Sequence, residues 1–378
     1  MERTRLFFID NLRILLITLV IMVHLSITYG GAGGWYYTEV DEPDKISFIV
    51  LTWHNGAVQA FSMGLFFMIS GYFTPVSYDR KGPRRFLRDR LLRLGIPMLF
   101  YDFVINPLIE YALVTKVHGF NGSIWKLIAQ YFGKFHVGTG PLWFVEALLI
   151  FAVFYVLWRS LARTAGPAVQ SESKVPNNVA IAVFALALGA ISFVVRIWLP
   201  LGWAFGPLNF QFPFFPQYIG LFIVGIAAYR HNWLLRISDA TGRVWLCTAI
   251  VFIVILFPAL FVLGGARDDV SPFKGGVHWQ CLAYAAWEQF AGVAIIIALL
   301  VLFRKRLNCQ GKLAKAMSAS SYTAYIIHAP VAVLVALAIR NVTLYPLLKF
   351  ALAVLISVPL CFALGNLIRQ LPLARRIL

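Results

Sequence analysis

The chain of 378 residues is 60% hydrophobic and only 13% charged, and its mean hydropathy is strongly positive. A soluble protein of this length needs a charged surface around its core, so the composition excludes a soluble fold and indicates a polytopic membrane protein. No long stretch shows the alternating pattern that a membrane-spanning β-barrel needs. We therefore expect an all-α membrane protein.

Ten apolar stretches are long enough to cross the hydrocarbon layer, which takes about 20 helical residues. They cover residues 9–29, 47–74, 91–114, 142–161, 179–199, 214–229, 244–263, 280–303, 321–339 and 344–368. The first is too long for a signal peptide, and no convincing cleavage motif follows it, so we retain it as a span. The sequence predicts about ten transmembrane helices in a single membrane domain over residues 1–378, without a soluble extracytoplasmic domain.

Lysine and arginine occur in alternate connections between these spans, whereas the first connection carries Glu39, Asp41, Glu42 and Asp44. Short loops rich in lysine and arginine stay in the cytoplasm, so this alternation places both termini there. The net charge of +17 is then mostly topological. We expect a lipid bilayer around the protein and no nucleic-acid partner, because nucleic-acid readers present a soluble basic surface.

One basic cluster is larger than topology requires. Seven positive charges lie between residues 80 and 93, before the third span. A contact with anionic lipid headgroups explains them, and so does a site for a phosphorylated ligand, because guanidinium groups suit phosphate oxygens. The arginines that we consider for a ligand are Arg84, Arg85, Arg88, Arg90 and Arg93.

The first span carries an arginine and a histidine on one face. Arg13 and His24 are separated by about 1100° of helical rotation and roughly 16 Å of rise, so one lies deeper than the other on the same side. Asp10 precedes Arg13 by three residues and is placed to orient it. Because an ionisable residue inside a membrane is costly, the sequence predicts a functional site along this face.

The ninth span offers a second polar stripe. Ser321, Tyr325 and His328 follow the i, i+4, i+7 spacing of one helical face, and His328 is expected about two turns from the cytoplasmic end of its helix. A lone membrane histidine is usually a packing residue, but this one lies at a depth near that of His24. We expect the two imidazoles to face a common buried cavity.

Other ionisable residues in spans have two interpretations each. For Asp102, Glu146 and Glu288, pairing with a buried base is as plausible as catalysis, and Arg196 is expected to extend towards the outer membrane surface. Trp143 fits an aromatic belt at the interface as well as a platform for a sugar. The cysteines (Cys247, Cys281, Cys309 and Cys361) have no paired spacing, so we expect packing roles and neither disulfides nor a metal site.

Five motifs in this order resemble the acyltransferase-3 family of membrane O-acyltransferases over almost the whole chain. They read IDNLR at residues 9–13 with His24 after it, FFMISGYF at 66–73, RLLRLGIP at 90–97, PLWFV at 141–145 and SYTAYIIHAP at 321–330. The arginine and histidine spaced by ten residues are the family's signature and correspond to Arg13 and His24. Each motif alone is weak, whereas together they are specific.

The resemblance implies transfer of an acyl group from cytoplasmic acyl-CoA to a hydroxyl of an extracytoplasmic carbohydrate, with acetyl- or succinyl-CoA as a co-substrate rather than a bound cofactor. It implies that Arg13, Ser70 and the arginines of the second loop bind acyl-CoA. It gives His24 the role of general base or transient acyl carrier. Tyr325, His328 or Ser70 would then donate to the oxyanion, and Trp143, Glu146, Glu288 and Ser321 would support the acceptor.

Lacking an added domain, the chain is similar to the family's membrane-only members, which include periplasmic glucan succinyltransferases. That similarity implies the bacterial cytoplasmic (inner) membrane. A proton-coupled or small-anion transporter is the alternative, because buried carboxylates and histidines also form proton relays, although no inverted repeat is visible. Haem ligation by His24 and His328 is a third hypothesis, and it needs facing imidazoles. The sequence leaves a homo-oligomer open.

Overall fold

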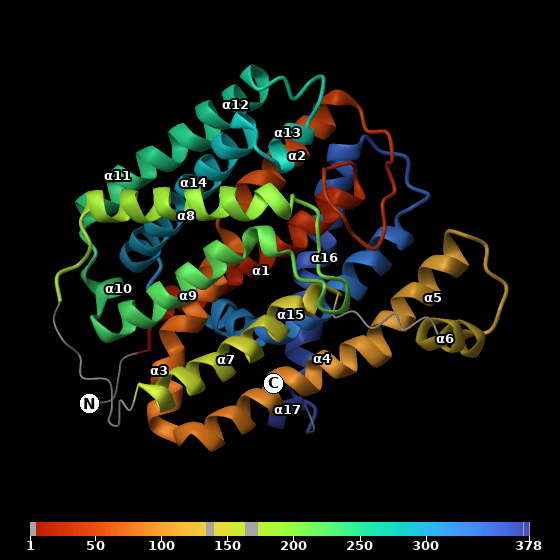
Figure 1. Cartoon of the computed structure of the whole chain (residues 1–378). Coiled ribbons are helices and arrows are strands. Elements are labelled where there is room, and N and C mark those ends of the chain that lie inside the picture. The colour runs from red at the N-terminus through yellow and green to blue at the C-terminus, as the bar shows by residue number, and fades with distance from the viewer. Residues whose placement is uncertain (1–4, 134–139, 163–172, 373, 378) are drawn as a thin grey trace.

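The computed structural model describes residues 5–133, 140–162, 173–372 and 374–377. Within these residues the chain is a bundle of helices without a β-strand, apart from one isolated bridge between Phe205 and Phe210 (Figure 1). Nine helical segments of this described part are long and apolar enough to cross a membrane. The expectation of an all-α polytopic membrane protein is confirmed.

The helices are joined by short connections over most of the chain. The first group comprises α1 (Phe7–Thr28), α2 (Lys45–Gln59), α3 (Ser62–Arg90), α4 (Ile96–Phe100), α5 (Asn106–Lys116), α6 (Ile124–Gly133) and α7 (Trp143–Leu161). The second comprises α8 (Asn178–Trp198), α9 (Phe215–Arg230), α10 (Trp233–Arg236), α11 (Asp239–Ile250), α12 (Phe257–Leu263), α13 (Ser271–Lys274), α14 (Trp279–Arg306), α15 (Lys312–Ala338), α16 (Pro346–Ile368) and α17 (Ala374–Ile377).

Nine segments replace the ten expected spans because two of them belong to one helical run. Lys45–Lys116 forms one run of 72 residues that comprises α2 to α5 and is far longer than one crossing needs. At Gly82 the backbone leaves the helical conformation, with φ 73° and ψ 168°. Figure 1 shows the chain turning within the last part of α3 and then running along α4 and α5. Stretches 47–74 and 91–114 therefore lie on opposite sides of this turn.

The expected single helix over 47–74 is wrong, because α2 ends at Gln59 and α3 begins at Ser62. At this break the carbonyl of Ala60 accepts a hydrogen bond from Nε2 of Gln217, 2.7 Å away. A Cβ at Gly292 would lie only 2.0 Å from the same carbonyl oxygen, so this glycine of α14 makes room for the break. The interruption depends on contacts with α9 and α14, and the hydropathy of the segment alone does not predict such contacts.

Helix α15 begins nine residues earlier than the expected start at residue 321. Its first two turns contain lysine, leucine, alanine and methionine, which all favour helix although the segment is not apolar enough for a span. His328 accordingly lies far from the helix start rather than two turns from it. Helix α6 was also not expected, because its ten residues are too few to cross a membrane.

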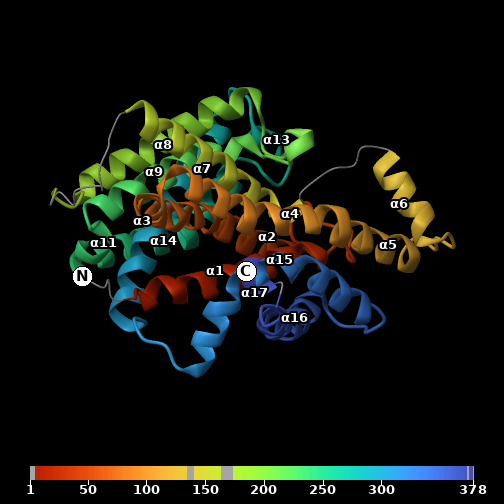
Figure 2. The ribbon, with the colours of Figure 1, turned by 90° about the horizontal axis from the view of Figure 1, so that it is seen from below.

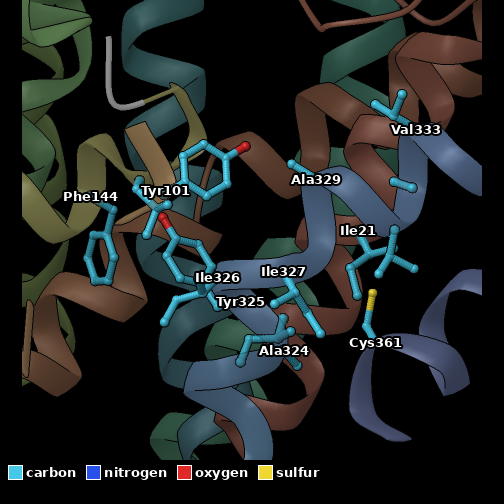
Figure 3. Packing of buried hydrophobic residues seen from close by; sticks show 14 of the residues in the cluster. Ile21, Tyr101, Phe144, Ala324, Tyr325, Ile326, Ile327, Ala329, Val333 and Cys361 are labelled. Atoms are coloured by element: carbon cyan, nitrogen blue, oxygen red, sulfur yellow. The ribbon is translucent and has the colours of Figure 1, made fainter. Parts of the chain in front are cut away.

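The core of the bundle lies where α1 packs against α15 and α16, with α14 and α3 on its other sides (Figure 2). Ile21 of α1, Ile327 of α15 and Cys361 of α16 belong to one buried cluster, part of which Figure 3 shows. Cys281 is buried as well, in keeping with the expected packing role, whereas Cys247 and Cys309 are exposed. The first span is thus the central helix of the fold.

Candidate active site

Side-chain hydrogen bonds fix the beginning of α1 against the connection between α14 and α15. Nδ2 of Asn11 donates to the carbonyls of Leu307, at 2.7 Å, and Cys309, at 3.0 Å. Nε2 of Gln310 donates in turn to Oδ1 of Asn11, at 2.8 Å. Asn11 therefore sets the position of the turn that carries Arg13.

Arg13 lines a cleft of about 420 Å³ between α1, the second half of α3, the turn Leu91–Gly95 and Tyr322 of α15. We call it the basic cleft and define it by its lining: Arg13, Phe73, Ser77, Arg80, Lys81, Phe86, Asp89, Arg90, Arg93, Leu94, Tyr322 and Ile377. Five of these side chains are cations and one is a carboxylate. Such a cleft attracts an anion with several negative oxygens.

Three contacts shape the cleft around Arg13 and Arg93. The guanidinium of Arg13 lies 5.0 Å from the centre of the Phe73 ring, and Oδ1 of Asp10 lies 3.4 Å from its Nη1. The hydroxyl of Tyr322 donates to the carbonyl of Arg93 at 2.7 Å, joining α15 to the π-helical turn Leu91–Gly95. Asp10 thus contacts Arg13, while its other carboxylate oxygen pairs with Arg5 at 2.7 Å, and its role in orienting Arg13 stays a prediction.

Only part of the expected acyl-CoA site lies in the basic cleft. Arg13, Arg90 and Arg93 line it. Arg84, Arg85 and Arg88 are exposed and, like Ser70, do not belong to the lining. Two cations that precede the turn at Gly82, Arg80 and Lys81, line the cleft as well. These two cations were part of the charge count in the sequence but not of the predicted site.

Deeper along α1, His24 belongs to a cluster of three rings. The Trp35 ring lies on the imidazole of His24 with centroids 3.6 Å apart and planes 15° apart. The His328 ring is 5.2 Å from His24 and 6.1 Å from Trp35. A straight stack would separate Trp35 from His328 by the sum of the other two distances, so His328 lies beside His24 rather than behind it. The structure thus brings the two expected imidazoles together.

Hydrogen bonding fixes the tautomer of His328. Its Nδ1 lies against the carbonyl of Tyr325 and must donate to it, because a carbonyl only accepts. Nε2 of the neutral ring is then an acceptor, and it is buried without a hydrogen-bond partner in the described part of the chain. Nδ1 of His24 is likewise buried without a hydrogen-bond partner among the described residues. Two unsatisfied imidazole nitrogens at one buried place form a candidate proton-transfer site.

Tyr325 supports this pair rather than pointing a free hydroxyl at it. The hydroxyl donates to the carbonyl of Pro141, two residues before α7. The ring lies 5.5 Å from His328 and 6.1 Å from Phe144, and Figure 3 shows the tyrosine beside Phe144. Ser321, on the same stripe, donates to the carbonyl of Met317 at 2.9 Å. In this geometry both hydroxyl protons are engaged with backbone.

The residues expected around the acceptor are distributed over the bundle. Trp143 packs inside, with its ring 5.6 Å from that of Tyr218. Glu288 is almost fully buried and pairs with Arg196, whose side chain is also fully buried. The expected extension of Arg196 to the membrane surface is wrong, because the carboxylate of Glu288 compensates its charge inside the protein. Glu146 is partly buried in the first turn of α7.

Sequence reasoning missed Trp35, which no helical spacing relates to His24. Its only signal was an aromatic run of Trp35, Tyr36 and Tyr37 after a glycine-rich stretch. Among the described residues no group of three or more His, Cys, Asp or Glu side chains is placed to hold a metal ion. His24 and His328 stand side by side, an arrangement that does not match the facing imidazoles of a bis-histidine haem.

Comparison with known proteins gives the family of the chain. The family described as an acyltransferase domain matches residues 6–366. Glucans biosynthesis protein C from Salmonella paratyphi B is 23% identical over 343 residues, which cover 86% of this chain and 82% of that protein. The proteins of that name from Salmonella dublin and Salmonella enteritidis show the same values. No solved structure matches the chain significantly. The chain belongs to the acyltransferase-3 family, and it is a membrane acyltransferase.

Proposed function

We propose that the protein transfers an acyl group from acyl-CoA at the cytoplasmic face to a hydroxyl of a carbohydrate on the other side of the membrane. The observation that carries the proposal is that one helix, α1, contributes Arg13 to the basic cleft and His24 to the histidine pair. A donor bound by its phosphates at Arg13 would extend its thioester along α1 towards His24. The name of the glucan-related relatives supports a glycan acceptor.

The arrangement supports a general-base reaction. His24 would take the proton from the acceptor hydroxyl as its oxygen attacks the thioester carbonyl, so that a C–O bond forms and the C–S bond breaks. The proton then passes to the departing thiolate, which leaves as the free thiol of CoA. His328, with its Nε2 lone pair unsatisfied and its Nδ1 held by Tyr325, is oriented to share that proton.

Purified protein in detergent tests the proposal, because a transporter has no compartment to fill there. Labelled succinyl- or acetyl-CoA and a soluble β-glucan are supplied, and release of CoA and labelling of the glucan are both measured. We expect equal amounts of the two products from the wild type and neither from His24→Ala. Undiminished labelling by His24→Ala would overturn the role of His24.

Trapping distinguishes a base from a covalent acyl carrier. If His24 accepts the acyl group, protein incubated with labelled acyl-CoA alone will carry label that hydroxylamine releases. The general-base reaction leaves the protein unlabelled and releases CoA only when the glucan is present. Arg13→Ala provides the comparison, because it should raise the KM for acyl-CoA more than it lowers kcat.

A further inference from the structure

We propose that Trp35 is a positioning residue of the acyl-transfer site, which holds the His24 ring in place and shields it from water entering through the connection between α1 and α2. This inference rests on the proposed function, since the reaction that water would compete with is acyl transfer. Trp35 belongs to the connection over residues 29–44, which we call the outer strap. The structure supports this role through the ring contact itself and through the anchoring of the strap.

The ring contact covers one face of the catalytic candidate. At 3.6 Å between centroids and 15° between planes, the indole and the imidazole of His24 are in van der Waals contact over their flat surfaces. Nε1 of Trp35 is buried without a hydrogen-bond partner among the described residues. Burying that N–H costs free energy, so hydrogen bonding does not explain why the indole lies here. The position must be imposed by the rest of the strap.

One end of the strap is bonded to the helix that carries His24. The amide of Gly31 donates to the carbonyl of Ser26 at 2.8 Å, and the amide of Glu39 donates to the carbonyl of Thr28 at the same distance. These two bonds bracket Trp35 in sequence. The strap therefore folds back onto the last turn of α1, one turn beyond His24.

Helix α2 holds the strap from a second direction. The amide of Ala32 donates to the hydroxyl of Thr52 at 3.0 Å, and the carbonyl of Ala32 accepts from Nδ2 of Asn55 at 3.1 Å. Both polar groups of this backbone unit are thus satisfied by α2. Three residues later the chain places the indole on His24.

Helix α16 closes the far end of the strap. Nζ of Lys349 pairs with Oε1 of Glu39, and the lysine side chain is only 6% exposed. The hydroxyl of Tyr345 donates to Oδ1 of Asp44 at 2.7 Å. Hydrogen bonding from Ser47, and then from Tyr345, lowers the pKa of Asp44 to about 2, so this carboxylate stays charged at neutral pH. We call the Lys349–Glu39 pair the latch.

A shield at His24 has a chemical purpose. Water at the site would attack the thioester in place of the acceptor hydroxyl, giving a free carboxylic acid and the CoA thiol. Covering the ring face excludes that water and keeps the imidazole in one orientation. The proposal predicts that removing the indole makes the partly buried His24 more accessible to water and raises the share of hydrolysis.

Accessibility is measured first, without any substrate. Diethyl pyrocarbonate modifies neutral imidazoles, and mass spectrometry of peptides gives the rate at His24 relative to the exposed His118. We expect Trp35→Ala to raise this relative rate several-fold and Trp35→Phe to raise it less. Trp125→Ala, which removes a 75% exposed tryptophan of α6, is the matched control and should not change it. An unchanged rate at His24 in Trp35→Ala would overturn the proposal.

Product partition is the second measurement. With acyl-CoA and glucan present, Trp35→Ala should raise the ratio of free acid to acylated glucan, and lower kcat for transfer on the order of 10–100-fold through misplacement of His24. If neither the wild type nor any variant transfers acyl groups, but the modification rates of His24 change as expected, the proposed function is wrong and the shielding role of Trp35 is supported. If transfer occurs and the partition is unchanged, the shield fails alone.

Variants of the latch test the anchoring of the strap without removing the indole of Trp35. Lys349→Glu places two carboxylates together and should increase the modification of His24, as Trp35→Ala does. Adding Glu39→Lys exchanges the two charges and should restore the wild-type rate. Restoration shows that the strap acts through its anchoring, whereas equal modification rates in the wild type and both latch variants would contradict the anchoring.

Discussion

The imidazole rings of His24 and His328 lie side by side, with centroids 5.2 Å apart and planes 20° apart. One comes from the helix at the start of the chain and the other from a helix near its end. Each retains a buried nitrogen without a hydrogen-bond partner among the described residues. This relationship is the basis of the proposed chemistry, and it makes His328 the first residue to vary.

His328→Asn keeps a donor close to the position of Nδ1 but removes the acceptor Nε2. If that nitrogen shares the proton of the acceptor hydroxyl, kcat should fall on the order of 100-fold. The KM for acyl-CoA should change little, because the basic cleft is untouched. Steady-state kinetics with labelled acyl-CoA and glucan decide this. Equal kcat values for the wild type and His328→Asn would show that His328 only packs in the site and does not take part in proton transfer.

The basic cleft predicts which arginines of the second loop bind the donor. Arg93→Ala removes a cation of the lining, and loss of a charge-assisted hydrogen bond of about 1.5–3 kcal/mol raises KM for acyl-CoA roughly 10- to 100-fold. Arg84→Ala removes an exposed arginine outside the lining and should leave KM unchanged. These values come from initial rates at varied acyl-CoA.

An acyl-pantetheine donor is the internal control for this cleft, because it has the thioester without the phosphates of CoA. With that donor, Arg93→Ala and the wild type should share one KM. If Arg84→Ala were as harmful as Arg93→Ala, the phosphates would bind outside the cleft. The two donors therefore separate a phosphate contact from a general loss of structure.

The sequence predicted the class of fold and the central helix well, because both follow from strong and local signals. Long apolar runs separated by basic loops specify a helical membrane protein, and α1 ends within one residue of its expected end. Arg13 and His24 share a face through helix geometry alone. Charge and spacing along single helices also predicted Arg90 and Arg93, which line the cleft with Arg13, and His328, which lies beside His24.

The remaining features depend on contacts between distant parts of the chain. The break at Ala60 requires Gln217 and Gly292, and Arg196 is buried because Glu288 lies opposite it on another helix. The position of Trp35 follows from bonds to three helices, so no periodic pattern contains it. A single sequence reports what each segment prefers, whereas these positions are set by pairs of segments.

The Arg196–Glu288 pair gives a test of stability. Breaking a buried ion pair leaves one uncompensated charge and typically costs about 3–5 kcal/mol. Arg196→Met should therefore lower the free energy of unfolding by that amount, as measured by titration with denaturing detergent. The double variant Arg196→Met/Glu288→Leu removes both charges and should recover most of the loss. If the double variant were as unstable as the single one, packing of the arginine would be the larger contribution.

Close approach of α3 and α9 gives a second test. A Cβ at Gly71 would lie 2.2 Å from the carbonyl oxygen of Phe222, so Gly71→Ala forces these helices apart. We expect a loss of about 1–3 kcal/mol from overpacking. Gly95→Ala is the control, because its Cβ would have no neighbour within 4 Å and its φ of −69° suits alanine. Equal unfolding midpoints for the two variants would contradict the described packing.

Sealed vesicles containing the protein test whether the acyl group crosses the membrane during transfer. Labelled acyl-CoA is added outside vesicles whose cytoplasmic face points outwards, and a soluble glucan is enclosed within. We expect labelled glucan inside, CoA released outside, no intact acyl-CoA inside, and no labelling with His24→Ala. Labelling that occurs only when donor and glucan share one compartment, or that persists in His24→Ala, would contradict this expectation.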